Sequence, residues 1–235
     1  MTNDLFMSIS KSINYLGTKE QAYNFYKKLA QSRFNVADKV EFALRHWGWN
    51  GEARIGAAEQ IEEMKRKGFV IPPNGENFIQ QFYNLVIPFK TSAVGAHIKF
   101  NPFFSNEECI ISEIMSIQFH VRMVDIGLVM YFYNDFNFES EHMEFQKTNQ
   151  YYAFWSIELF LGTDGKVYYY EPDEGIAGIL SENLLNFFSE IFGFPNAKKK
   201  GLEPLTEENA LACTPLLDEI EEKLESGEYR PYDVK

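Results

Sequence analysis

The stretch SIELFLGTDGKVYYYE at 156–171 constrains the fold more than any other part of the sequence. Its apolar residues alternate with a period of two on both sides of a GTDG turn, at Ile157, Leu159 and Leu161 and then at Val167 and Tyr169. Such alternation around a short glycine-containing turn is typical of a β-hairpin. We therefore expect a sheet built around this hairpin, with one well-specified core face.

Composition indicates a globular chain. Of the 235 residues, 16% are aromatic, with 22 Phe and 13 Tyr, and this is not the composition of a disordered protein. Mixed α/β folds often reach this length as one domain. The chain can therefore bury a substantial core.

Helix signals fill most of the first 85 residues. Apolar residues recur at helical spacing from Leu5 to Leu16, before Gly17. Four further helices are predicted from caps and apolar stripes: after the capping box TKEQ at 18–21, from Asn35 to Gly48, through Ala57, Ile61 and Met64 to Gly68, and from Asn74 through Phe78 and Phe82. The following strand, LVIPF at 85–89, is expected at a sheet edge because proline cannot donate to a strand ladder.

The middle of the chain leaves one assignment open. The segments 97–103 and 123–138 are rich in the β-branched and aromatic residues of strands. The segment 110–119 fits a strand or a helix, since Ile110, Ile114 and Ile117 fall at i, i+4 and i+7. Both assignments stay open at this point.

Helices are expected again after the hairpin. Ser181 is predicted to cap a helix that buries Leu184, Leu185, Phe188, Ile191 and Phe192 and ends at Gly193. Two shorter helices are expected at 206–213 and 215–225, the second started by Thr214 and Pro215.

Acidic residues outnumber basic ones. The chain has 34 Asp and Glu against 22 Lys and Arg, and residues 101–194 alone have 15 against 3. The negative electrostatic field of so many acidic side chains repels nucleic-acid phosphates and attracts basic proteins. A basic protein partner is therefore expected, and nucleic acid is not.

The sequence predicts a soluble, cytoplasmic protein. The N-terminus has no basic region of the kind that begins a secretory signal. The longest apolar run, at 126–133, is far shorter than the roughly 18 residues of a membrane-spanning helix. The two distant cysteines, Cys109 and Cys213, do not form a disulfide framework.

Three separated pieces of the chain form one ordered pattern. The first piece, at 47–56, has Gly48, Trp49 and Arg54; the second, at 76–85, has Phe78, Ile79, Phe82 and Leu85; the third, at 156–171, has Leu159, Phe160, Asp164, Gly165, Val167 and Tyr168. Together they resemble the SUKH superfamily of immunity proteins, and most of all its third group. Two departures stand out: the proline that commonly precedes Gly-Arg is absent, and Tyr83 and Asn84 replace paired glycines. The order and spacing of the pieces carry the resemblance.

The resemblance implies an α+β fold with a mixed, mainly antiparallel sheet packed with helices. It spans residues 36–194, with a helical extension at 1–35 and a second one, packed on the domain, at 195–235. It implies an immunity protein that neutralises a bacterial toxin by occlusion, without cofactor or metal. The expected partner is a basic toxin, a nuclease for example, encoded by a neighbouring gene. The alternative is a non-catalytic intracellular scaffold or regulatory protein, and monomer and homodimer both stay open.

Charge and aromatic character select the candidate partner-binding residues. They lie in an acidic stretch, at the end of the hairpin and just after it, at Glu139, Glu141, Glu144, Tyr170, Asp173 and Glu174. Carboxylates complement a basic partner, and a tyrosine ring can anchor an interface. Solvated loop residues and, for Tyr170, core packing are the alternative interpretations.

Catalytic motifs are absent from the sequence. The four histidines are scattered, and there is no HExxH, CxxC, GxSxG or P-loop pattern. Only the stretch 139–145 gathers ligand-type side chains, around His142, and one histidine with exposed carboxylates is common surface chemistry. We therefore expect a protein that is not an enzyme.

Overall fold

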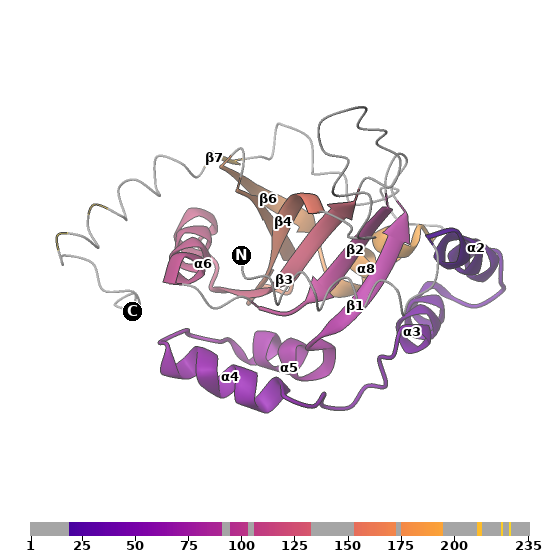
Figure 1. Ribbon diagram of the computed structural model, residues 1–235, viewed down its shortest axis with the longest axis horizontal. Helices are drawn as coiled ribbons and strands as arrows, with labels where there is room; N and C mark the ends of the chain where they lie inside the picture. Colours follow the sequence, from indigo (N-terminus) through magenta and orange to yellow (C-terminus); the bar gives the residue numbers. More distant parts are fainter. Residues whose placement is uncertain are drawn as a thin grey trace, which may run out of the picture.

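The computed structural model describes residues 19–90, 95–102, 106–132, 153–172, 175–194 and 211–212, together with Glu222 and Ser226. In this part of the chain, helices pack on one seven-stranded sheet (Figure 1). The strands follow one another across the sheet in chain order, and each pair of neighbours is antiparallel. The α+β fold class is thereby confirmed.

The predicted hairpin lies near the middle of the sheet. Their bounds are β1 (Leu85–Lys90), β2 (Gly95–Phe100), β3 (Met123–Phe132), β4 (Ala153–Gly162), β5 (Val167–Glu171), β6 (Ile176–Ser181) and β7 (Leu211–Ala212). The predicted hairpin is β4–β5, with Leu161 opposite Val167 and Leu159 opposite Tyr169. Strand β1 lies at the sheet edge, as Pro88 predicts.

Six helices are described: α2 (Lys19–Ala30), α3 (Val36–His46), α4 (Ala57–Arg66), α5 (Pro73–Phe82), α6 (Asn106–Phe119) and α8 (Leu184–Phe192). The helices predicted after TKEQ, after Asn35, and around Ala57 and Phe78 are confirmed as α2 to α5. The segment 110–119, which fitted a strand or a helix, is helical within α6. The helix expected at 5–16 and most of the one at 215–225 lie outside the described residues.

The larger core covers one face of the sheet. Helices α2, α3, α4, α5 and α8 contribute to it, and Tyr26, Leu44, Ile61, Phe78 and Phe188 are among its buried members. Tyr26 donates a hydrogen bond to the carbonyl oxygen of Pro88 at 2.5 Å. Helix α2, which was assigned to an N-terminal extension, is therefore packed into the same core as the rest of the described chain.

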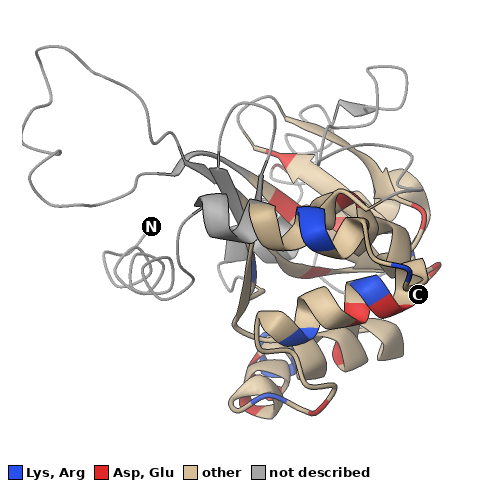
Figure 2. Ribbon diagram, turned by 90° about the vertical axis from the view of Figure 1, so that its right-hand side faces the viewer, with Lys and Arg blue, Asp and Glu red and all other residues tan. Residues whose placement is uncertain are grey.

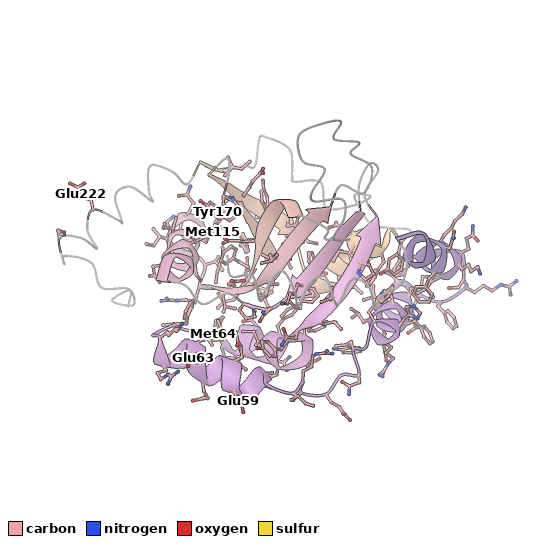
Figure 3. All side chains as sticks on the ribbon, in the orientation of Figure 1. Glu59, Glu63, Met64, Met115, Tyr170 and Glu222 are labelled. Atoms are coloured by element: carbon pink, nitrogen blue, oxygen red, sulfur yellow. The ribbon has the colours of Figure 1, made fainter. Side chains whose placement is uncertain are left out.

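A second, smaller core lies on the other face, under α6. Its buried members are Ile114, Met115, Met123, Phe160, Tyr168, Tyr170 and Ala177. Figure 3 shows Met115 of α6 close to Tyr170 of β5. Strand β5 is consequently buried along its whole length, on both faces. The sequence indicated only the first face of the hairpin.

Four local predictions were wrong. Asn183, and not Ser181, caps α8, because its side chain accepts from the Asn186 amide at 2.9 Å while Ser181 still belongs to β6. Asn74 lies inside α5, whose N-cap is Pro72. Leu211 and Ala212 form strand β7 beside β6, not a helical turn, so the C-terminal region adds to the sheet. Leu185 of α8 is exposed.

Two glycines permit close backbone approach. A Cβ atom on Gly75 of α5 would lie 2.3 Å from Val124 Cγ1 of β3. A Cβ atom on Gly127 would lie 2.2 Å from the carbonyl oxygen of Lys99, and Gly127 has a φ of +139°. Gly127 follows a register shift in β3, where its amide donates to Asp125 Oδ1 at 2.7 Å. Helix α5 and strand β2 can thus press against β3.

Candidate functional site

Arg54 joins the first two pieces of the resemblance. Its Nε donates to the carbonyl oxygen of Tyr83 at 2.6 Å and its Nη1 donates to that of Gly48 at 3.0 Å. Its own amide donates to the carbonyl oxygen of Gln80 at 2.8 Å. The guanidinium therefore satisfies two backbone acceptors at once, one after the end of α3 and one after the end of α5.

Aromatic packing supports the same joint. The ring of Trp49 stacks on Phe82 of α5, with 6.0 Å between ring centroids and 20° between planes. Arg45 of α3 lies over the Trp49 ring at 5.4 Å, within cation–π range. Arg54 and Trp49, which belong to the pattern of the resemblance, thus fix the loop between α3 and α4 to α5. Arg45, which is not part of that pattern, packs on the Trp49 ring.

The hairpin, the third piece, is tied to α5 as well. Asn74 Nδ2 donates to the carbonyl oxygen of Gly162 at 2.7 Å, which links the start of α5 to the hairpin turn. At that turn the Tyr168 hydroxyl donates to Asp164 Oδ2 at 2.9 Å. Burial, and then this hydrogen bond, raise the pKa of Tyr168. The three pieces form one connected framework of turns and apolar packing.

Most of the predicted contact residues lie outside the described residues. These are Glu139, Glu141, Glu144, Asp173 and Glu174. Tyr170 is described, and only 4% of it is exposed. Its ring packs in the smaller core under α6, so we withdraw it as an interface anchor, which needs an accessible ring.

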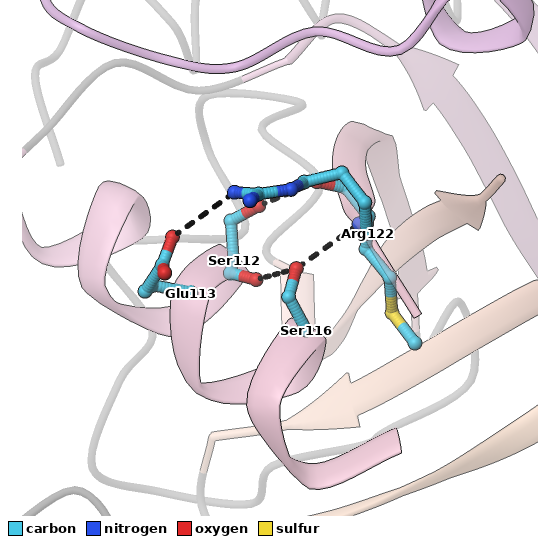
Figure 4. Close-up of polar contacts among 5 residues, drawn as sticks. Ser112, Glu113, Ser116 and Arg122 are labelled. Atoms are coloured by element: carbon cyan, nitrogen blue, oxygen red, sulfur yellow. Dashed lines mark hydrogen bonds and ion pairs between the residues drawn. The ribbon is translucent and has the colours of Figure 1, made fainter. Parts of the chain in front are cut away.

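A buried polar cluster joins α6 to the start of β3 (Figure 4). Ser112 Oγ donates to the carbonyl oxygen of Met123 at 3.2 Å, and the Met123 amide donates to Ser116 Oγ at 3.0 Å. Beside them, Arg122 Nη1 lies 3.7 Å from Glu113 Oε2, with 25% of the arginine side chain and 6% of the glutamate side chain exposed. The second oxygen, Glu113 Oε1, is buried without a hydrogen-bond partner in the described part of the chain. Sequence reasoning did not find this cluster, because Glu113 and Arg122 carry no motif.

Lys99 and His46 are among the other ionisable groups whose pKa values are shifted. Burial lowers the pKa of Lys99 on β2, a residue that is only 6% exposed. Partial burial also lowers the pKa of His46, whose ring stacks on Phe25 with 4.0 Å between centroids. The lowered pKa favours the neutral form of the His46 ring.

Large apolar side chains are exposed at a few places. Phe34 and Phe42, 51% and 48% exposed, lie against each other near the α2–α3 corner, with 5.0 Å between ring centroids. Ile55, next to the anchored Arg54, is fully exposed. On α4, Figure 3 shows Glu59 and Glu63 on the outer side of the helix and Met64 directed inward.

Within the described residues, no group of three or more His, Cys, Asp or Glu side chains is arranged to hold a metal ion. No helix in the same part of the chain is both long and apolar enough to cross a membrane.

Comparisons with protein-family models, with curated proteins and with solved structures find no match to this chain.

Proposed function

We propose that this protein is an immunity protein that binds a toxin and neutralises it by occlusion. The observation that carries the proposal is the framework around Arg54. The residues that give the resemblance are used to hold the loop after α3, the helix α5 and the hairpin together. Residues committed to packing and backbone hydrogen bonds suit a scaffold that presents a binding surface. On this proposal the protein performs no reaction.

Charge supports a basic toxin as the partner. Residues 101–194 carry 15 acidic and 3 basic side chains, and a toxin that acts on nucleic acid needs a basic surface for its substrate. An acidic inhibitor can cover such a surface and is steered to it by the field. We propose Glu139, Glu141, Glu144, Asp173 and Glu174 as the contact residues.

Co-expression provides the direct test. Cells that express the toxin encoded by the neighbouring gene should survive when this protein is also expressed. The purified proteins should form a complex whose Kd rises with salt, because screening weakens charge pairs at an interface. No rescue, or an affinity that is insensitive to salt, would contradict the proposal.

Two sets of variants separate a specific contact from net charge. The first replaces Glu139, Glu141 and Glu144 by Gln and should weaken the complex by at least ~10-fold, since each charge pair at an interface contributes on the order of 1 kcal/mol or more. The control replaces Glu52, Glu59 and Glu62 by Gln. These three glutamates are exposed and lie in the first half of the sequence, and the control changes the net charge by the same amount as the first set. Equal weakening by both sets would exclude the stretch 139–144 as the contact.

A further inference from the structure

An exposed aromatic strip runs along the α2–α3 corner. Phe34 and Phe42 form its outer pair, each about half exposed. One turn further along α3, His46 stacks on Phe25 of α2. Single exposed apolar residues are normal on a protein surface, but adjacent half-exposed phenylalanines are the kind of patch that marks an interaction site. We call Phe25, Phe34, Phe42 and His46 the aromatic strip.

Basic side chains border the aromatic strip. Lys27 and Lys28 of α2 and Arg33 in the following turn are exposed, and they form no ion pair within the described part of the chain. We call these three residues the cationic rim. Figure 2, which views the molecule from the side of α2 and α3, shows blue bands on these helices.

The nearby acidic residues on α3 are already engaged. Asp38 accepts a hydrogen bond from Asn35 Nδ2 at 2.8 Å, and Glu41 pairs with Arg45 at 2.8 Å. Neither pairs with the cationic rim. The corner is therefore locally positive on a molecule whose net charge is −12. A surface that is locally opposite in sign to the whole molecule selects a partner by local charge.

We propose that the aromatic strip and cationic rim bind an acidic segment of a partner protein, one with an apolar side chain that packs on the paired rings of Phe34 and Phe42. Carboxylates pair with Lys27, Lys28 and Arg33, and the rings supply the apolar contact that interface centres need. A two-fold contact between copies of this chain would place like charges opposite each other. Nucleic acid and anionic membranes present far longer runs of negative charge than a short acidic segment, so the net charge of −12 opposes them more strongly. The proposal does not depend on toxin neutralisation.

The test uses the full chain and a defined probe. A short fluorescein-labelled peptide of Glu and Asp with one Trp and one Leu is titrated with the protein, and fluorescence anisotropy is followed. Binding is expected, and added salt should weaken it. The double variant Phe34→Ser/Phe42→Ser, and separately Lys27→Gln/Lys28→Gln/Arg33→Gln, should each raise Kd by at least ~10-fold.

Matched controls keep the result specific. Val70→Ser/Leu185→Ser removes two other half-exposed apolar side chains, and Lys65→Gln/Arg66→Gln/Lys67→Gln removes three charges from the last turn of α4 and its C-cap. Both should leave the Kd unchanged, and circular dichroism checks that every variant is folded. Absence of peptide binding, or equal losses in strip and control variants, would overturn the proposal. Tighter binding to phosphatidylglycerol vesicles or to single-stranded DNA would do the same.

Discussion

At the scale of single residues, Arg54 has the most specific geometry in the described chain. A guanidinium offers several donors in a fixed plane, so one side chain can satisfy the carbonyl oxygens of Gly48 and Tyr83 together. Lysine has a flexible ammonium group and cannot reproduce this planar arrangement. The two backbone acceptors therefore account for arginine at position 54.

Arg54→Lys should lower the free energy of unfolding by about 1–3 kcal/mol, because one carbonyl oxygen loses a charge-assisted hydrogen bond. Urea denaturation followed by circular dichroism measures the change. Arg66→Lys is the control, since 74% of the Arg66 side chain is exposed and its partner Glu63 is on the same helix. An equal effect of the two substitutions would show that Arg54 does not hold the loop to α5.

At the scale of elements, the sequence predicts best where local signals and tertiary packing agree. Asn35 caps α3 as predicted, since its side chain accepts from the Asp38 amide at 2.9 Å. At α8 the predicted cap, Ser181, is the last residue of β6, and Asn183 caps the helix instead. A cap can be placed only when the limit of the preceding strand is known.

Burial of the β4–β5 hairpin on both faces of the sheet is the main feature that the sequence did not reveal. Phe160, Tyr168 and Tyr170 alternate with the predicted inward residues of the hairpin, and this pattern alone does not say whether a second layer covers them. Helix α6 supplies that layer, from a segment whose own pattern fitted a helix or a strand. Without that layer, Tyr170 would lie on an outer face of the sheet, where an aromatic residue resembles an interface anchor. Its place among the predicted contact residues follows from this.

At the joint between α6 and β3, the two partners of the Glu113–Arg122 ion pair differ in burial, and removing one or the other should have unequal costs. Glu113 is almost fully buried, whereas Arg122 still reaches solvent. Arg122→Met leaves an unpaired buried carboxylate and should cost about 3 kcal/mol of unfolding free energy. Glu113→Gln leaves a cation that water can solvate, so its cost should be smaller, about 1 kcal/mol. The comparison uses urea denaturation of both variants, and a larger cost for Glu113→Gln would contradict this account of the joint.

At the scale of the whole molecule, α2 and β7 are built into the fold. Helix α2 packs into the larger core through Tyr26, and β7 extends the sheet beside β6. The predicted division into extension, domain and extension rests on the span of the resemblance and stays a prediction. The sequence could not show these contacts, because a one-strand addition such as Leu211–Ala212 is too short to carry a period.

The net charge gives a prediction in which salt acts with opposite signs on folding and on binding. With a net charge of −12, like charges repel one another in the compact state, so salt should raise the urea midpoint of the free protein. The same salt should raise the Kd of the complex with a basic toxin, because it screens attraction between the partners.

Both quantities are measured over one series of sodium chloride concentrations. Weaker binding at high salt cannot then be attributed to unfolding, since the protein is more stable under those conditions. A urea midpoint that falls with salt would mean that attractive pairs, such as Lys65 with Glu76 at 3.1 Å, outweigh the repulsion.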